Sequence, residues 1–309
     1  MQFAVSTDLE LNYFVLEQEG KIFKSFYPKT FIELFGLEDI NDQKDAKSRY
    51  LKSIIVKVLG PENLKEKLLC NMDEEIRKRL CLWSAKESII DLKDSISTLF
   101  FDVIAKTLIS YDPSTTTIDL MRYLKVFISS VFSFPFNFPG TAYHRSLQGR
   151  KIVMNLLKTL LSERMKSPRK ESKDFLDLLV DELGKENSML TEKSALNLIF
   201  VLLIASFVSS SQTISLATKF LSEDPKILKD LTGKPESNCG EKNYLVFGGG
   251  IRYCVGAEFS KMEMAIFLHY FVTKCKWKDV KGGNIVCSPS LEFPDGYHIQ
   301  VMPKNVRVL

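Results

Sequence analysis

The sequence has few histidines and no cysteine pair with the spacing of a metal finger. His144, His269 and His298 are the only histidines in 309 residues, and the six cysteines form no C-x-x-C. This scarcity argues against zinc fingers and histidine-rich metal centres, and it leaves few candidates for a Ser/His or Cys/His hydrolase. We therefore expect mostly reduced, structural thiols, and any unusual chemistry to come from a bound cofactor.

The sequence also lacks a strong charge bias. Forty-two Lys and Arg residues face 38 Asp and Glu residues, for a net charge of +4, and there is no long basic block. This balance predicts no nucleic-acid partner. Asp8, Glu10 and Asn12 interrupt the apolar residues at the start of the sequence, which therefore has no signal-peptide or anchor pattern. We expect a cytosol-facing globular protein without an N-terminal anchor.

Hydrophobic periodicity predicts a mainly α fold with a small antiparallel β part. Apolar residues recur at helical spacing over 9–19, 47–59, 64–82, 91–108, 118–132, 147–165, 175–183 and 191–221. A further helix is expected over 257–274. Turn signals at 282–283 and 294–296 separate short alternating segments, which predict antiparallel strands near the C-terminus.

One segment is apolar enough to raise the question of a membrane span. Positions 194–218 contain no charged residue and include LNLIFVLLIASFV. A transmembrane helix needs about 18 or more predominantly apolar residues. Here Ser, Thr and Gln fill the second half of the segment. We favour a long buried core helix over a membrane span.

The segment FGGGIRYCVG at 247–256 is the most informative stretch. Its glycines resemble a phosphate loop only weakly, because the third glycine of the dinucleotide motif and a following Gly-Lys-Ser/Thr are both absent. Taken as Phe-x-x-Gly-x-Arg-x-Cys-x-Gly before a helix, the segment resembles the heme-thiolate signature of the cytochrome P450 family. The alternative is an inert cysteine in a glycine-rich loop, which five matching positions make improbable.

The resemblance implies a role for each fixed position. Cys254 would be the ligand of a heme b iron, because a thiolate ligand favours O–O cleavage. The N-terminus of the following helix would help keep the sulfur deprotonated. Phe247 would pack beside the sulfur, and Arg252 would pair with a heme propionate. Gly250 and Gly256 would let the backbone turn tightly and approach the flat macrocycle.

Other segments resemble the plant sterol- and triterpenoid-oxidising members of the family, including the brassinosteroid oxidases. FPGTAYHRSLQGRK resembles their loop between the F and G helices, residues 6–36 resemble their B-helix region, and residues 281–302 resemble their C-terminal sheet. The resemblance implies a monooxygenase acting on a sterol- or triterpenoid-like lipid at the cytosolic face of the endoplasmic reticulum membrane. Electrons would come from NADPH through NADPH–cytochrome P450 reductase, docking near Lys242, Arg252 and Lys261.

Two helices depart from the family pattern. The helix at 191–221 aligns with the oxygen-activating helix, where relatives have an acid followed by Thr. Here these positions are Val208 and Ser209, so Ser209 is the remaining candidate for an oxygen-side hydroxyl, or else a small packing residue. In the helix at 47–59, Ser48 stands where relatives have Trp or His. Arg49 and Lys52 are candidates for a propionate contact, or else belong to a solvated face.

The chain is also short between its two most family-like parts. Only 15 positions separate Thr232 from Phe247, where the family carries a Glu-x-x-Arg helix, a strand pair and a meander. The residues from Glu74 to Arg77 match the Glu-x-x-Arg motif, but they lie far before this interval. We expect them to form an ion pair on a helix surface instead. We expect one incomplete cytochrome P450 domain over 1–309, with a helical part at 1–231 and the heme loop, following helix and strands at 232–309. It is either a heme monooxygenase or an internally deleted, non-catalytic chain that binds heme poorly or not at all.

Overall fold

A computed structural model describes residues 4–36, 46–60, 68–116, 118–131, 133–167, 174–233, 245–287 and 291–304. The helices in this part of the chain are α1 (Leu9–Glu17), α2 (Lys29–Phe35), α3 (Ala46–Leu59), α5 (Leu69–Ala85), α6 (Leu92–Ile109), α7 (Leu120–Ser130), α8 (Ala142–Lys166), α9 (Phe175–Leu183), α10 (Glu192–Glu223), α11 (Pro225–Gly233) and α12 (Ala257–Lys274). The strands are β1 (Ile89–Asp91), β2 (Cys275–Gly282), β3 (Val286–Cys287), β4 (Leu291–Glu292) and β5 (Tyr297–Pro303). The mainly α fold with a small antiparallel part is confirmed.

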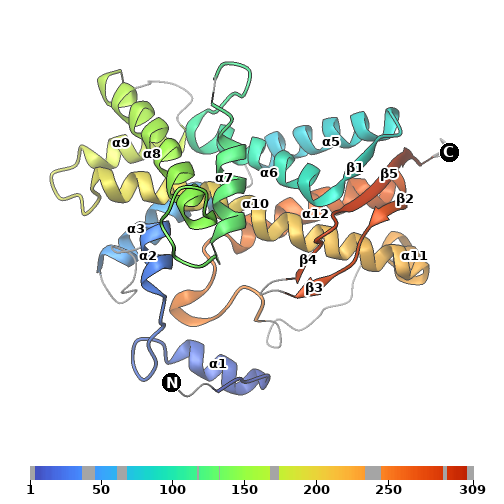
Figure 1. Ribbon diagram of the computed structural model, residues 1–309, viewed down its shortest axis with the longest axis horizontal. Helices are drawn as coiled ribbons and strands as arrows, with labels where there is room; N and C mark the ends of the chain where they lie inside the picture. The colour runs from blue at the N-terminus through green and yellow to red at the C-terminus, as the bar shows by residue number, and fades with distance from the viewer. Residues whose placement is uncertain are drawn as a thin grey trace.

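Helix α10 forms the centre of the fold, and the other elements are arranged around it (Figure 1). It packs along α6 and also contacts α8 and α12. Thr191 caps its N-terminus, since the Thr191 hydroxyl accepts from Ser194 N–H and Ser194 Oγ accepts from Thr191 N–H. In its most apolar 18-residue window, 78% of the residues are buried inside the protein. This burial favours the core-helix interpretation over a membrane span.

The strands form two small antiparallel sheets. The larger has the order β1-β5-β2, with Ile90 opposite Ile299 and Trp277 opposite Val301, and β3 pairs with β4. A Cβ on Gly282, whose φ is +74°, would lie 2.1 Å from the carbonyl oxygen of Gly296. This close approach explains why the expected turn needs glycine.

Side chains at the end of α10 anchor the larger sheet. Ser222 Oγ accepts from Trp277 Nε1 at 2.7 Å and donates to Asp279 at 3.1 Å, and Tyr297 Oη donates to Asp279 at 2.8 Å. Lys219 pairs with the same carboxylate at 3.3 Å. These bonds fix β2 and β5 to the end of α10.

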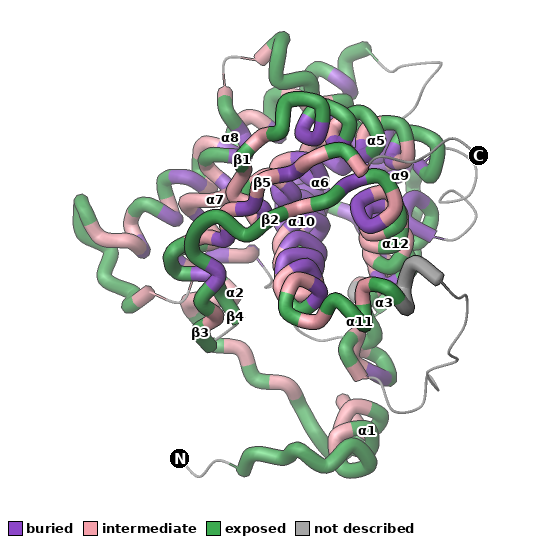
Figure 2. The backbone as a smooth tube through the Cα atoms, turned by 90° about the vertical axis from the view of Figure 1, so that its right-hand side faces the viewer, coloured by how far each residue is buried: buried purple, intermediate pink, exposed green. Residues whose placement is uncertain are grey.

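The buried residues follow α10 and α6 through the interior, whereas α1 lies at the edge of the molecule (Figure 2). Helix α1 has no buried residue. Its contact with the rest of the described chain includes the short 3-10 helix at Gly250–Arg252. The position of α1 therefore depends on the segment that carries the cysteine motif.

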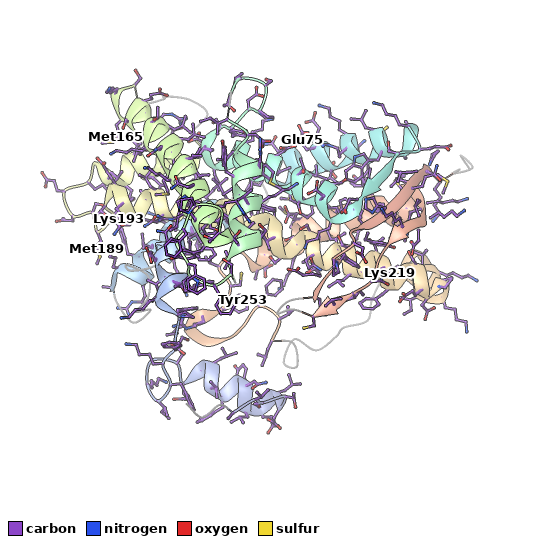
Figure 3. All side chains as sticks on the ribbon, in the orientation of Figure 1. Glu75, Met165, Met189, Lys193, Lys219 and Tyr253 are labelled. Atoms are coloured by element: carbon purple, nitrogen blue, oxygen red, sulfur yellow. The ribbon has the colours of Figure 1, made fainter. Side chains whose placement is uncertain are left out.

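The surface ion pair expected at Glu74 and Arg77 involves a different carboxylate. Arg77 pairs with Asp73, one helical turn earlier, at 3.6 Å, and its guanidinium lies over the ring of Tyr270. The i, i+4 spacing explains the choice of partner. Figure 3 shows Glu75, in the same turn of α5, well separated from Tyr253 of the cysteine loop. This part of α5 does not replace the family's Glu-x-x-Arg helix.

A buried ion-pair cluster joins the ends of α8 and α9. Arg164 pairs with Asp174 at 3.0 Å and with Asp177 at 2.6 Å, and all three side chains are at most 8% exposed. Asp174 and Asp177 also form a reciprocal capping box at the start of α9. The guanidinium thus neutralises two carboxylates that the fold keeps away from water.

We predict that Arg164→Met lowers the free energy of unfolding by about 3–5 kcal/mol, because it leaves two buried carboxylates without their cation. Urea unfolding followed by circular dichroism measures this change. The control is Arg77→Met, which removes an exposed pair and is expected to cost less than about 0.5 kcal/mol. Equal effects of the two substitutions would contradict a structural role for the buried cluster.

Candidate heme-thiolate site

The cysteine loop is closed by its own backbone. Cys254 N–H donates to the carbonyl of Phe247 at 2.9 Å, and Tyr253 N–H donates to the carbonyl of Gly250 at 3.2 Å. Helix α12 begins at Ala257, so Cys254 lies just before a helix N-terminus. That position offers a partial positive charge to a thiolate. The Cys254 side chain is exposed, which leaves the sulfur accessible to a ligand.

Two glycines of the motif serve different purposes in the structure. Gly250 has a φ of +54°, and a Cβ there would lie 2.5 Å from the carbonyl oxygen of Leu16. The tight turn expected at Gly250 is present, and the close approach that it permits is to α1. Among the described residues beyond its chain neighbours, a Cβ on Gly256 would meet Cys254 Sγ alone, at 4.0 Å. Gly256 therefore keeps space open beside the sulfur.

Arg252 is held by residues from the beginning of the chain. Its Nη2 donates to Glu19 at 2.9 Å, and its Nη1 donates to Tyr27 Oη at 3.2 Å. The guanidinium also lies over the Tyr27 ring, 5.6 Å from the centroid. Glu19 accepts two further hydrogen bonds, from Ser25 N–H and Oγ. Burial acts to raise the pKa of Glu19, but the bonds from Ser25 and Arg252 outweigh it and hold the pKa below its usual range.

One donor of Arg252 remains available. Arg252 Nε is buried and has no hydrogen-bond partner among the residues that the structure describes. A buried N–H without a partner is costly, and a carboxylate is the acceptor that a guanidinium binds best. The orphaned Nε therefore fits the propionate contact expected for Arg252, with Glu19 and Tyr27 holding the rest of the group.

The basic residues of α3 differ in their relation to the loop. Lys52 Nζ donates to the carbonyl oxygen of Ile251. Burial lowers the pKa of Lys52, Arg252 lowers it further, and the charge of Cys254 opposes the shift. Arg49 lies on the exposed side of the helix. The two α3 candidates for a propionate contact therefore differ. Lys52 reaches the cysteine loop, whereas Arg49 is exposed like a residue on a solvated helix face.

Two further residues flank the loop. The ring of Phe247 is half-buried, with the ammonium of Lys261 lying 5.5 Å from its centroid. Lys261 also pairs with Glu258 on the same helix at 2.9 Å. Lys242 and the side chain of Ser48 lie outside the described residues.

The middle of α10 exposes one stripe of small side chains. Ala205, Ser209 and Thr213 are exposed at four-residue spacing, whereas Ser210 and Ser211 are buried. Ser211 Oγ accepts from Ser97 on α6 at 2.9 Å, so it packs between helices. The two interpretations of the serine run therefore apply to different residues: Ser209 faces outward from the core, whereas Ser211 packs against α6.

Thr213 is a hydroxyl that sequence reasoning missed. It lies one turn after Ser209, and its Oγ1 donates to the Ser209 carbonyl at 2.9 Å. Continuing the four-residue spacing from Ser209 would have found it. The pairing of Glu19 with Arg252 had no comparable signal, since 233 positions separate the two residues.

The residues of this site fit a heme-thiolate protein. The fit rests on an accessible cysteine before a helix N-terminus and on a buried guanidinium Nε that lacks an acceptor. Cys254 would ligate the iron and Arg252 would bind a propionate. The comparisons with known proteins give the same class.

The chain belongs to the cytochrome P450 family, whose members are heme-dependent monooxygenases. The family model, cytochrome P450, matches residues 1–242 and 233–297. Cytochrome P450 87A3 of Oryza sativa subsp. japonica is 36% identical, over 97% of this chain and 76% of the relative. Beta-amyrin 16-alpha-hydroxylase of Maesa lanceolata is 26% identical, over 97% and 82%. The retinoic acid-bound cyanobacterial CYP120A1 has a TM-score of 0.79 at 17% identity, over 96% of this chain and 88% of that one.

The comparisons also bear on the short interval before the cysteine loop. The alignment with the rice relative spans 394 positions, whereas this chain has 309 residues, so at least 85 alignment positions have no residue here. The two parts of the family match meet at 233–242, within the interval where the sequence lacks the Glu-x-x-Arg helix. The expectation of an incomplete cytochrome P450 fold is confirmed.

We predict that Glu19→Gln lowers the stability of the chain above the usual glutamate pKa. The folded-state pKa of Glu19 is lowered, so its contribution is present above the unfolded pKa and is lost as the pH falls through the folded pKa. Thermal unfolding between pH 3 and pH 7 measures the stability of both chains. The stability lost between neutral and acidic pH should be smaller in the variant than in the unmodified chain. Glu10→Gln, on the exposed side of α1, is the control. A variant with an unchanged pH profile would refute the role of the Glu19–Arg252 pair.

Proposed function

We propose that this chain is a heme-dependent monooxygenase that hydroxylates a sterol- or triterpenoid-like lipid. The observation that carries the proposal is the cysteine loop, in which Cys254 lies accessible at the start of α12 beside the partly unsatisfied Arg252. Electrons would come from NADPH through NADPH–cytochrome P450 reductase. Lys261, exposed on α12 beside the loop, is one basic residue for such a partner.

The proposed substrate class follows the names of the relatives. They include a beta-amyrin 16-alpha-hydroxylase, a cucurbitadienol 11-hydroxylase from Siraitia grosvenorii, and a 3-epi-6-deoxocathasterone 23-monooxygenase from Arabidopsis thaliana. These names describe oxygenation of large, mostly apolar ring systems. We extend that class, and no particular compound, to this chain.

The chain's own residues would have distinct tasks. A bound heme supplies the iron that activates dioxygen, and a thiolate ligand favours O–O cleavage. Cys254 Sγ would provide that ligand, with the N-terminus of α12 stabilising its negative charge. Arg252 Nε would bind a propionate while Glu19 holds the guanidinium in place. Lys52, through the Ile251 carbonyl, would keep the loop against α3, and Ser209 would offer its hydroxyl from the open stripe of α10.

A position at the cytosolic face of the endoplasmic reticulum membrane is part of the proposal. Phe134, Phe136 and Phe138, between α7 and α8, are each more than 60% exposed. Exposed aromatic side chains grouped in one loop are suited to the interface of a bilayer. They give this chain an apolar surface for membrane contact that does not depend on α10.

We predict that the purified chain, reconstituted with heme, gives a reduced carbon monoxide difference spectrum with the Soret band typical of thiolate ligation. Cys254→Ala should abolish that band, because it removes the proposed iron ligand. Cys70→Ala, which changes another exposed thiol, should leave it intact. A chain that binds no heme would support the internally deleted, non-catalytic alternative and overturn the proposal. A band that persists in Cys254→Ala would overturn the assignment of the ligand.

A further inference from the structure

The central part of α10 has no titratable side chain of its own. From Ser194 to Thr218 the helix contains no Asp, Glu, Lys, Arg, His, Cys or Tyr. Its exposed stripe at Ala205, Ser209 and Thr213 therefore offers hydroxyls but no group that stores a proton at neutral pH. A proton reservoir for this face would have to come from another element.

Helix α12, which packs against α10, brings such a group. Glu263 is 0% exposed, and neither carboxyl oxygen has a hydrogen-bond partner of normal geometry among the described residues. Ser210 of α10 is 1% exposed, and its Oγ also lacks a partner in the described part of the chain. Two orphaned polar groups thus lie in the interface of α10 and α12. Buried groups of this kind are the usual sites of ordered water.

The surroundings of Glu263 favour its neutral form. Burial raises the pKa of Glu263 well above its usual range, and the Ser210 hydroxyl opposes this shift. No charged side chain among the described residues contributes to it. A protonated carboxyl has an O–H to donate, whereas a carboxylate has none. Glu263 therefore holds a proton next to α10 without a cation to balance a negative charge.

Helical spacing connects this carboxyl to the exposed stripe. Ser210 and Thr213 are three residues apart, so their side chains are neighbours on the helix surface. Thr213 is exposed, and its hydroxyl donates to the carbonyl of Ser209. Hydroxyl groups accept and donate at the same atom. Ser210 and Thr213 thus form a line of hydroxyls from the buried carboxyl to the open side of α10.

We propose that Glu263 stores a proton for the exposed stripe of α10 and exchanges it through Ser210 and Thr213, with ordered water between them. When the proton leaves, the Glu263 O–H bond breaks as Ser210 Oγ gains a proton, Ser210 releases its own hydroxyl proton to Thr213, and Thr213 releases its own hydroxyl proton to solvent water. The carboxylate is reprotonated by solvent water along the same line. The use of this proton in oxygen chemistry at Ser209 rests on the proposed function. The proton exchange between Glu263 and solvent does not.

Infrared spectroscopy of the full-length chain in D₂O tests the exchange without relying on heme. The protonated carboxyl of Glu263 should give a C=O band at neutral pH that is missing from Glu263→Gln, an isosteric variant without the acidic proton. On dilution into D₂O this band should shift as deuterium replaces the proton. Ser210→Ala should slow the shift by about tenfold, because it removes the hydroxyl that passes the proton and with it about one hydrogen bond's worth of stabilisation of the transfer step. Ser210→Thr should restore the rate.

Ser215→Ala is the matched control. Ser215 is also fully buried on α10, but its hydroxyl donates to the Ser211 carbonyl, so its removal should leave the rate unchanged. The proposal fails if neutral pH shows no Glu263 band, or if Ser210→Ala and Ser215→Ala exchange at the same rate. Heme binding is measured separately in the difference spectrum. A chain without heme whose exchange still depends on Ser210 would refute the proposed function and leave the proton line standing.

Discussion

The ion pair between Glu19 and Arg252 is the contact on which the arrangement of the site depends. It joins the beginning of the described chain to the loop that carries Cys254, at 2.9 Å and with little exposure of either side chain. Gly250 allows α1 to approach the same loop closely, and Lys52 of α3 donates to it from another direction. Two segments distant in sequence, residues 16–19 and helix α3, thus converge on the cysteine loop just before α12 begins.

The same structure treats its buried charges in two ways. Arg164 and Arg252 each have carboxylate partners, which compensates the desolvation of these guanidinium groups. Glu263 has no such partner in the described chain, and its burial raises its pKa and favours the neutral form instead. An ion pair holds both of its side chains in place, whereas a neutral carboxyl keeps a proton that it can transfer. This difference separates the groups that hold the site together from the one group suited to proton exchange.

Sequence alone predicted the longer helices and the cysteine loop, because periodicity and a fixed motif are local signals. It did not predict the short helices α2 and α11 or the strand β1. It did not predict Glu19 as the partner of Arg252, since nothing in a sequence marks two charges 233 positions apart as neighbours. Glu263 was missed for a related reason. It lies in a helix whose apolar and polar residues are spread around all sides, and its burial arises only from the packing of α12 against neighbouring elements. Long-range contacts, rather than local propensities, decide these assignments.

The central claim is that Cys254 is the protein ligand of a heme iron. Electron paramagnetic resonance of the ferric, heme-loaded chain tests it most directly, because the low-spin signal depends on the atom bound to the iron. The account predicts the rhombic low-spin signal of a thiolate-ligated heme and its loss in Cys254→Ala. A signal of imidazole ligation, or one that Cys254→Ala leaves unchanged, would contradict it.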